Sequence, residues 1–434
     1  MARQWLVLLR ALPSFLKYAI LGISVPIVIY LSSDRASSQT STNAQAQALT
    51  QAGHVQLERG EAAAALQSWQ AARKLYLQSK NEEGAIGSSI NQSLALQSLG
   101  LYPRACNTLA EALELELWLC QSNTSLRQQK ERPIQIGQRQ PSSLLNVIGL
   151  RSMGNVLRNI DKLRESEIVL RQAYKNSVTH QTEKYDVLLS LANTERALYV
   201  QALNRYQLVE EPVAQGVALQ TVDLKLRQAL TNYQKIVSES DAANLVLQAK
   251  LNYLSLVLDL NRYFVLYGAD LAASSLQKIQ QETKPALLPS IKQLLATQFD
   301  SLPDIDSIYA RLNFANSMIE AYQITDLNEA LLKEKIDMRL QVNNIAKNAL
   351  KVAENINNIR AKSYALKALS QVAKILDNPE QSRTYLVAAL RSTQSVQAWD
   401  IAYQIQQQLG MFYNRAGDLP KAIKYYKAAI ASLD

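Results

Sequence analysis

The chain has 434 residues, of which 48% are hydrophobic and 19% are charged, an ordinary globular mix. Its two cysteines and two histidines are too few for the usual metal clusters, and its dispersed formal charge of +9 favours a soluble surface over a nucleic-acid footprint. Helix-forming Leu, Ala, Gln, Lys and Glu dominate, so we expect an all-α fold.

Residues 1–38 have the pattern of a signal peptide or a single membrane anchor. Arg3, Arg10 and Lys17 precede an apolar run at 18–31. As a helix this run would span about 21 Å, less than the ~30 Å hydrocarbon core, which favours a cleaved signal peptide over an uncleaved anchor or a buried helix. Export would make the chain periplasmic or extracellular, and an anchor would hold it to the membrane by residues 18–31.

Residues 39–45 are rich in Ser, Thr, Asn and Gln, and we expect a flexible linker there. From residue 46 to 434 helices are expected to follow one another in pairs. The first pair shows small residues around one aromatic side chain at intervals of seven, five, four and three residues: Gly53, Gly60, Ala65, Trp69 and Ala72.

The last pair repeats these intervals at the other end of the chain, with Gly410, Gly417, Ala422, Tyr426 and Ala429. Small residues let two antiparallel helices approach closely, the aromatic side chain fills the remaining space, and a glycine in the turn accepts a positive φ. The spacing is typical of the tetratricopeptide repeat, a helix pair of about 34 residues. We therefore predict a tetratricopeptide-type α-solenoid, a right-handed superhelix of about eight degenerate pairs over 46–434.

The pattern continues in weaker form between these two pairs. The second pair follows at a stretched period, from Gly60 to Gly100, because its helices are longer. Residues 115–143 contain prolines and arginines and are expected to form an insertion, either a solvated loop or a docking loop for an acidic partner. Ser307–Ile319 is expected to begin the sixth pair, whose second helix runs on to about Glu354.

Cys106 and Cys120 are the two cysteines of the chain. If 105–119 is one helix, the two residues lie about 21 Å apart, well beyond the ~7 Å that a disulfide can bridge. If the helix breaks near Leu117, the chain could fold back and pair them, and export would make such a bond chemically allowed. The sequence leaves both arrangements open.

Asn155 and Arg158 recur further along the chain, at the same spacing, as Asn193 and Arg196. Residues three apart share one face of a helix, and in similar repeat arrays the first helices line a concave groove. An arginine fork and an amide at these positions could hold a peptide backbone or its carboxylate. The alternative is that all four are solvated polar positions.

Nothing in the sequence indicates catalytic or cofactor chemistry. His54 and His180 lie near no cysteine and have no metal-ligand spacing, and the glycine motifs of nucleotide-binding loops are missing from the sequence. We therefore expect no enzyme activity, no metal and no cofactor.

Four segments, residues 151–158, 189–197, 251–256 and 308–316, resemble cyanobacterial proteins in which such repeats precede a caspase-like CHAT domain. They read RSMGNVLR, LSLANTERA, LNYLSL and IYARLNFAN. The resemblance covers about 45–434 and stops where the CHAT domain would start. It implies a repeat scaffold, exported in many members, without the catalytic His and Cys of the peptidase.

We therefore expect a non-enzymatic scaffold that binds a protein or peptide in its groove, without nucleic acid, and that meets a membrane only through its N-terminal segment. The alternative is a regulatory or sensor subunit of a separately encoded CHAT peptidase. A neighbouring reading frame that encodes the missing domain would favour the second function.

Overall fold

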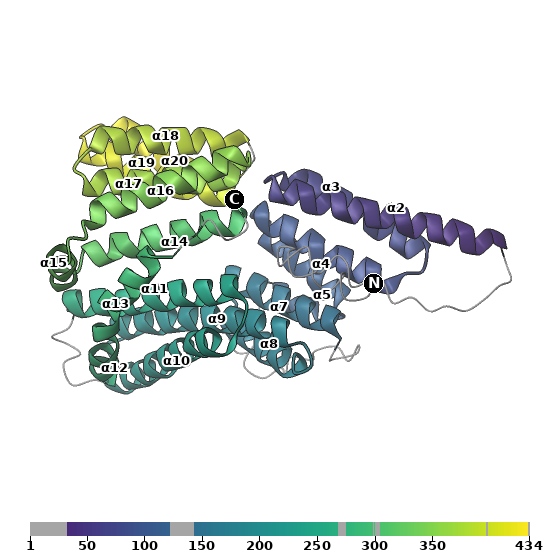
Figure 1. The fold of residues 1–434 in the computed structure, drawn as a ribbon, viewed down its shortest axis with the longest axis horizontal. Helices are drawn as coiled ribbons and strands as arrows, with labels where there is room; N and C mark the ends of the chain where they lie inside the picture. Colours follow the sequence, from purple (N-terminus) through teal and green to yellow (C-terminus); the bar gives the residue numbers. More distant parts are fainter. Residues whose placement is uncertain are drawn as a thin grey trace. The chain divides into compact units, whose positions relative to one another are not determined.

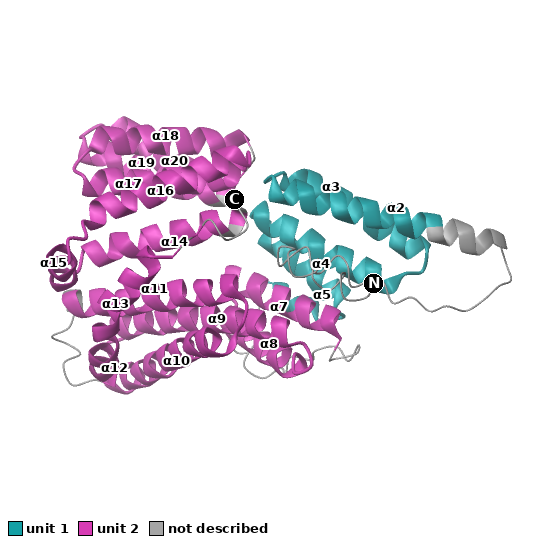
Figure 2. Ribbon diagram, viewed as in Figure 1, with its two compact units in different colours: residues 1–139 teal, residues 140–434 magenta. Residues whose placement is uncertain are grey.

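The computed structural model describes most of the chain: residues 33–121, 143–267, 275–297, 299, 304–395 and 398–432. Within these ranges every regular element is a helix, and the predicted all-α solenoid is confirmed. The chain divides into two compact units, residues 1–139 and 140–434 (Figure 2). The boundary falls inside the predicted insertion at 115–143, of which residues 122–142 lie outside the described ranges.

The described residues of unit 1 form two helix pairs and a short 3-10 helix (Figure 1). Each helix packs against the next one along the chain, so the pairs are built from neighbours in sequence. The elements are α2 (Ser33–Glu58), α3 (Ala62–Gln78), α4 (Glu82–Ser98), α5 (Tyr102–Ala112) and η3 (Leu117–Cys120).

The flexible linker predicted at 39–45 is wrong, because these residues form part of helix α2. The polar composition that suggested a linker is tolerated because this part of α2 contacts α3. The Ser79 hydroxyl donates to Asn43 Oδ1 at 2.7 Å, and Ala46 is fully buried in a cluster with Ala72 and Tyr76. Tertiary contact thus outweighs the weak helix propensity of Ser, Thr and Asn.

Turns with a positive φ set the length of each pair. In unit 1 the first three stand evenly spaced at Gly60, Lys80 and Gly100, and a fourth, Glu114, follows α5. The interval from Gly60 to Gly100 equals that from Asp377 to Gly417 in unit 2. The helices on either side of these turns run mostly to 17 residues. Helices of this length make the period longer than the roughly 34 residues of a tetratricopeptide repeat.

The first pair is held by close approach of α2 and α3 around one tryptophan. Trp69 is fully buried, its Nε1 donates to the carbonyl oxygen of Thr50 at 3.0 Å, and Ala65 and Ala72 beside it are also fully buried. A Cβ placed on Gly53 would lie 2.4 Å from Trp69 Nε1, so the indole fits only because residue 53 has no side chain.

Unit 2 is also built of helix pairs, and the short helices α12, η5, α13 and α15 lie among them (Figure 1). The elements are α7 (Leu144–Asn159), α8 (Leu163–Asn176), α9 (Gln181–Leu208), α10 (Pro212–Glu239), α11 (Ala243–Tyr267), α12 (Ser275–Thr283), η5 (Lys284–Ala286), α13 (Leu287–Leu295), α14 (Asp304–Tyr322), α15 (Thr325–Lys333), α16 (Met338–Asn355), α17 (Ile359–Ile375), α18 (Pro379–Ser395), α19 (Trp399–Arg415) and α20 (Leu419–Ala431).

The last pair, α19–α20, uses the same close approach as the first. A Cβ on Gly410 would come within 2.6 Å of the Tyr426 ring, and Ala422 and Ala429 are buried at 2% and 8% exposure. Gly417 has a φ of +76° in the turn between the two helices. The two ends of the described chain therefore share one packing solution, although they belong to different units.

The long second helix predicted for the sixth pair is wrong. The chain instead forms the short helix α15, turns through Lys335 at a φ of 60°, and begins α16 at Met338. The side chain of Asp337 accepts a hydrogen bond from the backbone N–H of Arg339, a helix-capping contact that starts α16. It is α16 that packs along α14 and completes the sixth pair.

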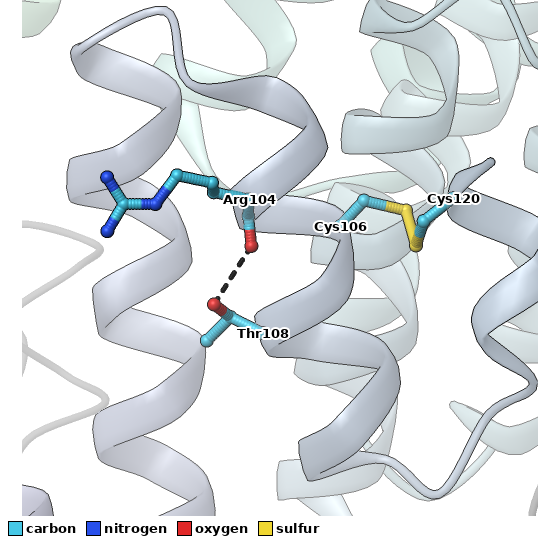
Figure 3. Close-up of a disulfide and its surroundings, with 4 residues drawn as sticks. All are labelled: Arg104, Cys106, Thr108 and Cys120. Atoms are coloured by element: carbon cyan, nitrogen blue, oxygen red, sulfur yellow. Dashed lines mark hydrogen bonds between the residues drawn. A yellow bond between two sulfur atoms is a disulfide. The ribbon is translucent and has the colours of Figure 1, made fainter. Parts of the chain in front are cut away.

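Cys106 and Cys120 form a disulfide, with their Cα atoms 5.6 Å apart (Figure 3). Helix α5 ends at Ala112, and the chain folds back so that η3 brings Cys120 to the side of α5. Leu119 in the same turn is fully buried. The broken-helix alternative considered from the sequence is therefore the one that the structure contains.

The N-terminal predictions fall mostly outside the described residues. The apolar run at 18–31 lies in the undescribed range 1–32, and residues 33–38 begin α2. Among the helices that the structure describes, none has the length and hydropathy needed to span a membrane.

Candidate functional site

The first helices of successive pairs in unit 2 form one layer. In this layer α7 contacts α9, α9 contacts α11, α11 contacts α14, and α14 contacts α17 (Figure 1). The side chains of these helices that stay partly exposed are largely polar, whereas their buried side chains are largely apolar. The four predicted groove residues lie on α7 and α9, at the start of this layer.

On α7, Arg158 bridges to the neighbouring first helix. Its Nη1 donates to the carbonyl oxygen of Ser190 at 3.1 Å and to Thr194 Oγ1 at 3.4 Å, both on α9. Burial lowers the pKa of this guanidinium. Asn155, one turn earlier, has a buried Oδ1 without a hydrogen-bond partner among the described residues.

On α9, Asn193 contacts α10 and α11, and Arg196 contacts α11. Asn193 Oδ1 accepts hydrogen bonds from the Tyr233 hydroxyl at 2.7 Å and from Asn252 Nδ2 at 2.9 Å. Arg196 Nη2 lies 2.5 Å from the carboxylate of Asp259, with 25% and 22% of the two side chains exposed. Arg158, Asn193 and Arg196 thus form contacts between helices of the fold. Whether the four predicted groove residues also bind a partner stays a prediction.

Further along the layer, a cleft of about 710 Å³ opens between α14 and α17. Its walls are mainly polar, with three cationic side chains and one carboxyl, and α11 contributes one of the cations. The lining residues are Arg262, Tyr309, Leu312, Asn313, Asn316, Ile319, Glu320, Gln323, Arg360, Tyr364, Lys367, Ala368 and Gln371.

Burial shifts the pKa values of two charged groups in the cleft, Glu320 and Lys367. Burial, with a smaller contribution from the Asp259 charge, raises the pKa of Glu320 to about 7, and Arg196 and Arg262 act against this rise. The Oε2 atom of Glu320 is buried and has no hydrogen-bond partner among the described residues. Burial lowers the pKa of Lys367, whose ammonium donates to Gln404 Oε1 on α19.

Aromatic rings form one wall of the cleft. The rings of Tyr309 and Tyr364 meet edge to face with centroids 6.1 Å apart, and the guanidinium of Arg360 lies 5.8 Å from the Tyr364 centroid. This stacking orients Arg360 at the cleft. The arrangement offers donors, amide groups and ring faces together, which suits a polar chain rather than an apolar ligand.

The charged residues of the cleft were not predicted from the sequence, although the spacing of those on α17 places them on one helix face. On α17, Arg360, Tyr364, Lys367 and Gln371 stand at intervals of four, three and four residues, which places them on one helix face. Asn313 and Asn316 on α14 were part of the CHAT-associated resemblance, but Glu320 one turn later was not. Only the packing of three helices shows that these residues share one cleft.

A second polar cluster, between α8, α9 and α10, serves packing. Glu195 on α9 is fully buried, lies 3.0 Å from Arg171 Nη2 and accepts from Asn232 Nδ2 at 2.6 Å. Glu167 on α8 lies 2.7 Å from the ammonium of Lys225 on α10. Burial raises the pKa of Glu195 to about 7, whereas hydrogen bonds from Lys225 and Arg171 outweigh burial and lower the pKa of Glu167.

These opposite pKa shifts predict opposite effects of removing each charge. A carboxyl whose pKa is higher in the folded than in the unfolded state stabilises the fold while it is protonated. For Glu195 this stabilising contribution is full below about pH 4.5 and is lost as the pH rises through about 7. Glu195→Gln should therefore raise the free energy of unfolding at pH 8 by about 2 kcal/mol and change it little at pH 4.5. Urea unfolding at the two pH values measures both.

Glu167→Gln is the matched control for this prediction. Because the folded-state pKa of Glu167 is lowered, its stabilising contribution is present above the unfolded pKa, and the variant should lose stability at pH 8. Equal effects of the two substitutions at pH 8 would show that the buried cluster does not distinguish its two carboxyl groups.

The histidines show no site of their own. His54 on α2 packs edge-on against Trp69 with ring centroids 5.2 Å apart, and burial lowers its pKa. His180 precedes α9 as its N-terminal flanking residue. In the part of the chain that the structure describes, no group of three or more His, Cys, Asp or Glu side chains could hold a metal ion.

These features define the chain as an all-α helical solenoid. No family model matches it, and no curated protein matches it in sequence. The resemblance to CHAT-associated repeats and the cyanobacterial origin that it implies therefore stay predictions.

Solved structures with matching helical folds include three of low sequence identity. A circular tandem repeat protein with a novel repeat topology is 12% identical, with 92% of this chain and 89% of that chain covered and a TM-score of 0.27. The apo form of the quorum sensor NprR from B. thuringiensis is 11% identical, with 88% and 99% covered and a TM-score of 0.32. A hypoxic regulator of sterol synthesis, described as a nuclear import adaptor, is 12% identical, with 91% and 99% covered and a TM-score of 0.28. All three TM-scores are low, and the assignment to the solenoids rests on the helix pairs of this chain itself.

Proposed function

We propose that this chain is a non-enzymatic scaffold that binds a protein or an extended peptide along the first helices of unit 2. The observation that carries the proposal is the polar layer from α7 to α17, which opens into the cleft between α14 and α17. A surface that continues over several helices suits a ligand that is itself extended. The predicted groove residues on α7 and α9 belong to this layer and act in it mainly as ties between helices.

The chemistry of the cleft fits a peptide backbone. Asn313 and Asn316 on α14 and Gln323 directly after it are exposed, and Gln371 on α17 lies across from them as a lining residue. Each carboxamide carries both a donor and an acceptor, as does each peptide unit of a ligand. Hydrogen bonds between these carboxamides and the peptide groups of a ligand would bind its main chain, with little dependence of the affinity on the ligand's side chains.

We also propose that the chain is exported from the cytoplasm. The disulfide between Cys106 and Cys120 supports this location, because such bonds persist in oxidising compartments and are rare in the cytosol. The charged and apolar pattern of residues 1–31 supports it from the sequence.

Selection of random peptides displayed on phage, with the full-length chain as target, tests the scaffold proposal. Asn313→Ala with Asn316→Ala removes two exposed amides from the first-helix layer, whereas Arg158 and Arg196 are poor probes because they also join helices. Selected peptides should bind this double variant about tenfold more weakly, the loss expected for one or two hydrogen bonds.

The matched control lies on a second helix. Asn344 and Asn348 on α16 are both exposed, and changing them to alanine should leave the affinity for the selected peptides unchanged. Two outcomes would rule out the first-helix layer as the binding surface. One is an equal loss of peptide affinity in the two double variants, and the other is an unchanged affinity in both.

A further inference from the structure

The cleft between α14 and α17 carries more positive than negative charge. Arg262, Arg360 and Lys367 line it, and Glu320 is the one carboxyl among its lining residues. Asp259 lies outside that lining and pairs with Arg196 at 2.5 Å and with Arg262 at 3.6 Å. Glu320 therefore acts as the internal counter-charge of the cleft.

The environment of Glu320 disfavours its ionised form. Oε2 is shielded from water and bonds to nothing among the described residues, a costly state for an ionised carboxylate. The charges that act on Glu320 are Arg196 on α9 and Asp259 and Arg262 on α11. Arg360 and Lys367 on α17 line the same cleft.

We propose that the cleft binds a carboxylate of an acidic peptide, and that this binding requires Glu320 in its protonated, neutral form. The proposal deepens the proposed function, on which it rests, by naming the ligand group and its regulation. A carboxylate accepts hydrogen bonds from the guanidinium of Arg360 and the ammonium of Lys367. Neutral Glu320 can donate its O–H to the same group, whereas ionised Glu320 would repel it.

The state of Lys367 fits an anionic ligand. Burial removes part of the solvation of the Lys367 ammonium and so lowers its pKa. An anion beside the ammonium would replace the lost solvation. The carboxylate can come from the C-terminus of a peptide or from an Asp or Glu side chain, and both sources present the same group.

Proton uptake by Glu320 sets the expected pH dependence. With a pKa of about 7, Glu320 is mostly neutral at pH 6 and mostly ionised at pH 8. Peptide carboxylates stay ionised at both values. Because only the neutral form of the cleft binds, the affinity should be up to about tenfold higher at pH 6 than at pH 8.

Fluorescence anisotropy with three labelled hexapeptides and the full-length chain tests the proposal at pH 6 and pH 8. Hexaglutamate with both ends blocked offers side-chain carboxylates, hexaglutamine with a free C-terminus offers one terminal carboxylate, and fully blocked hexaglutamine offers none. Binding of either carboxylate probe above the blocked hexaglutamine, stronger at pH 6, is the expected result and identifies the source. Equal binding of all three probes would overturn the proposal.

Substitutions test which residues bind the carboxylate and which one causes the pH dependence. Arg360→Ala and Lys367→Met should each weaken binding of the carboxylate probe about tenfold, and Lys347→Met, at an exposed position on α16, should not. Glu320→Gln should keep binding and lose the difference between pH 6 and pH 8. Glu195→Gln removes the carboxyl in the α8–α10 cluster, whose pKa is also about 7, and should retain the difference.

A pH dependence that persists in Glu320→Gln would overturn the assignment of this residue. If neutral peptides from the phage selection bind through Asn313 and Asn316 while no carboxylate probe binds, the scaffold proposal stands and the carboxylate proposal falls. Loss of both kinds of binding would reject the two proposals together.

Discussion

Replacing Trp69 with alanine should lower the free energy of unfolding of unit 1 by about 3–5 kcal/mol. The indole is fully buried, its N–H is bonded to the carbonyl oxygen of Thr50, and Gly53 has no side chain so that the ring can fit. Its loss leaves a cavity between α2 and α3 and removes the hydrogen bond to Thr50. Hydrogen exchange of the α2 and α3 peptides in urea measures the effect on this pair.

Trp399→Ala is the matched control for this substitution. Trp399 is 42% exposed at the start of α19, so its removal should change the stability by less than about 1 kcal/mol. A loss at Trp69 no larger than that at Trp399 would mean that the close approach of α2 and α3 does not hold the first pair together.

Opening the disulfide should be the second large effect. Cys106→Ser with Cys120→Ser should lower the stability of unit 1 by about 3 kcal/mol, the value expected for a closed loop of this size. The physical reason is that, without the disulfide, the segment from Cys106 to Cys120 gains conformational entropy in the unfolded chain. Thermal unfolding of the native chain and the double variant, each with and without a reductant, gives the measurement.

The reductant serves as the internal control in that experiment. It should bring the native chain to the stability of the double variant and should leave the variant unchanged. Two free thiols in the unreduced native chain, shown by alkylation and intact mass, would contradict both the disulfide and its use as support for export.

The sequence predicted the fold best where small and aromatic residues meet. Gly53 with Trp69 and Gly410 with Tyr426 sit at fixed intervals because close helix packing demands them, and those intervals are visible in one dimension. The prediction of a flexible linker at 39–45 failed, because these polar residues are stabilised in α2 by contacts with residues more than thirty positions away in the sequence.

The candidate site was harder to predict than the fold. Arg196 and Asp259 form an ion pair although they stand far apart in the sequence. Arg196, which was predicted to line the groove, therefore also links α9 to α11. Arg262, Glu320 and Lys367 meet in one cleft from three helices, and no local motif joins them. Periodicity places such residues on a helix face, but only the stacking of first helices shows which faces combine.

Hydrogen exchange of the full-length chain, with and without a peptide obtained by the phage selection, tests the central claim most directly. We expect the peptide to protect segments of α11, α14 and α17 that line the cleft and to leave the second helices α10, α16 and α18 unchanged. Protection confined to the second helices, or to unit 1, would contradict it.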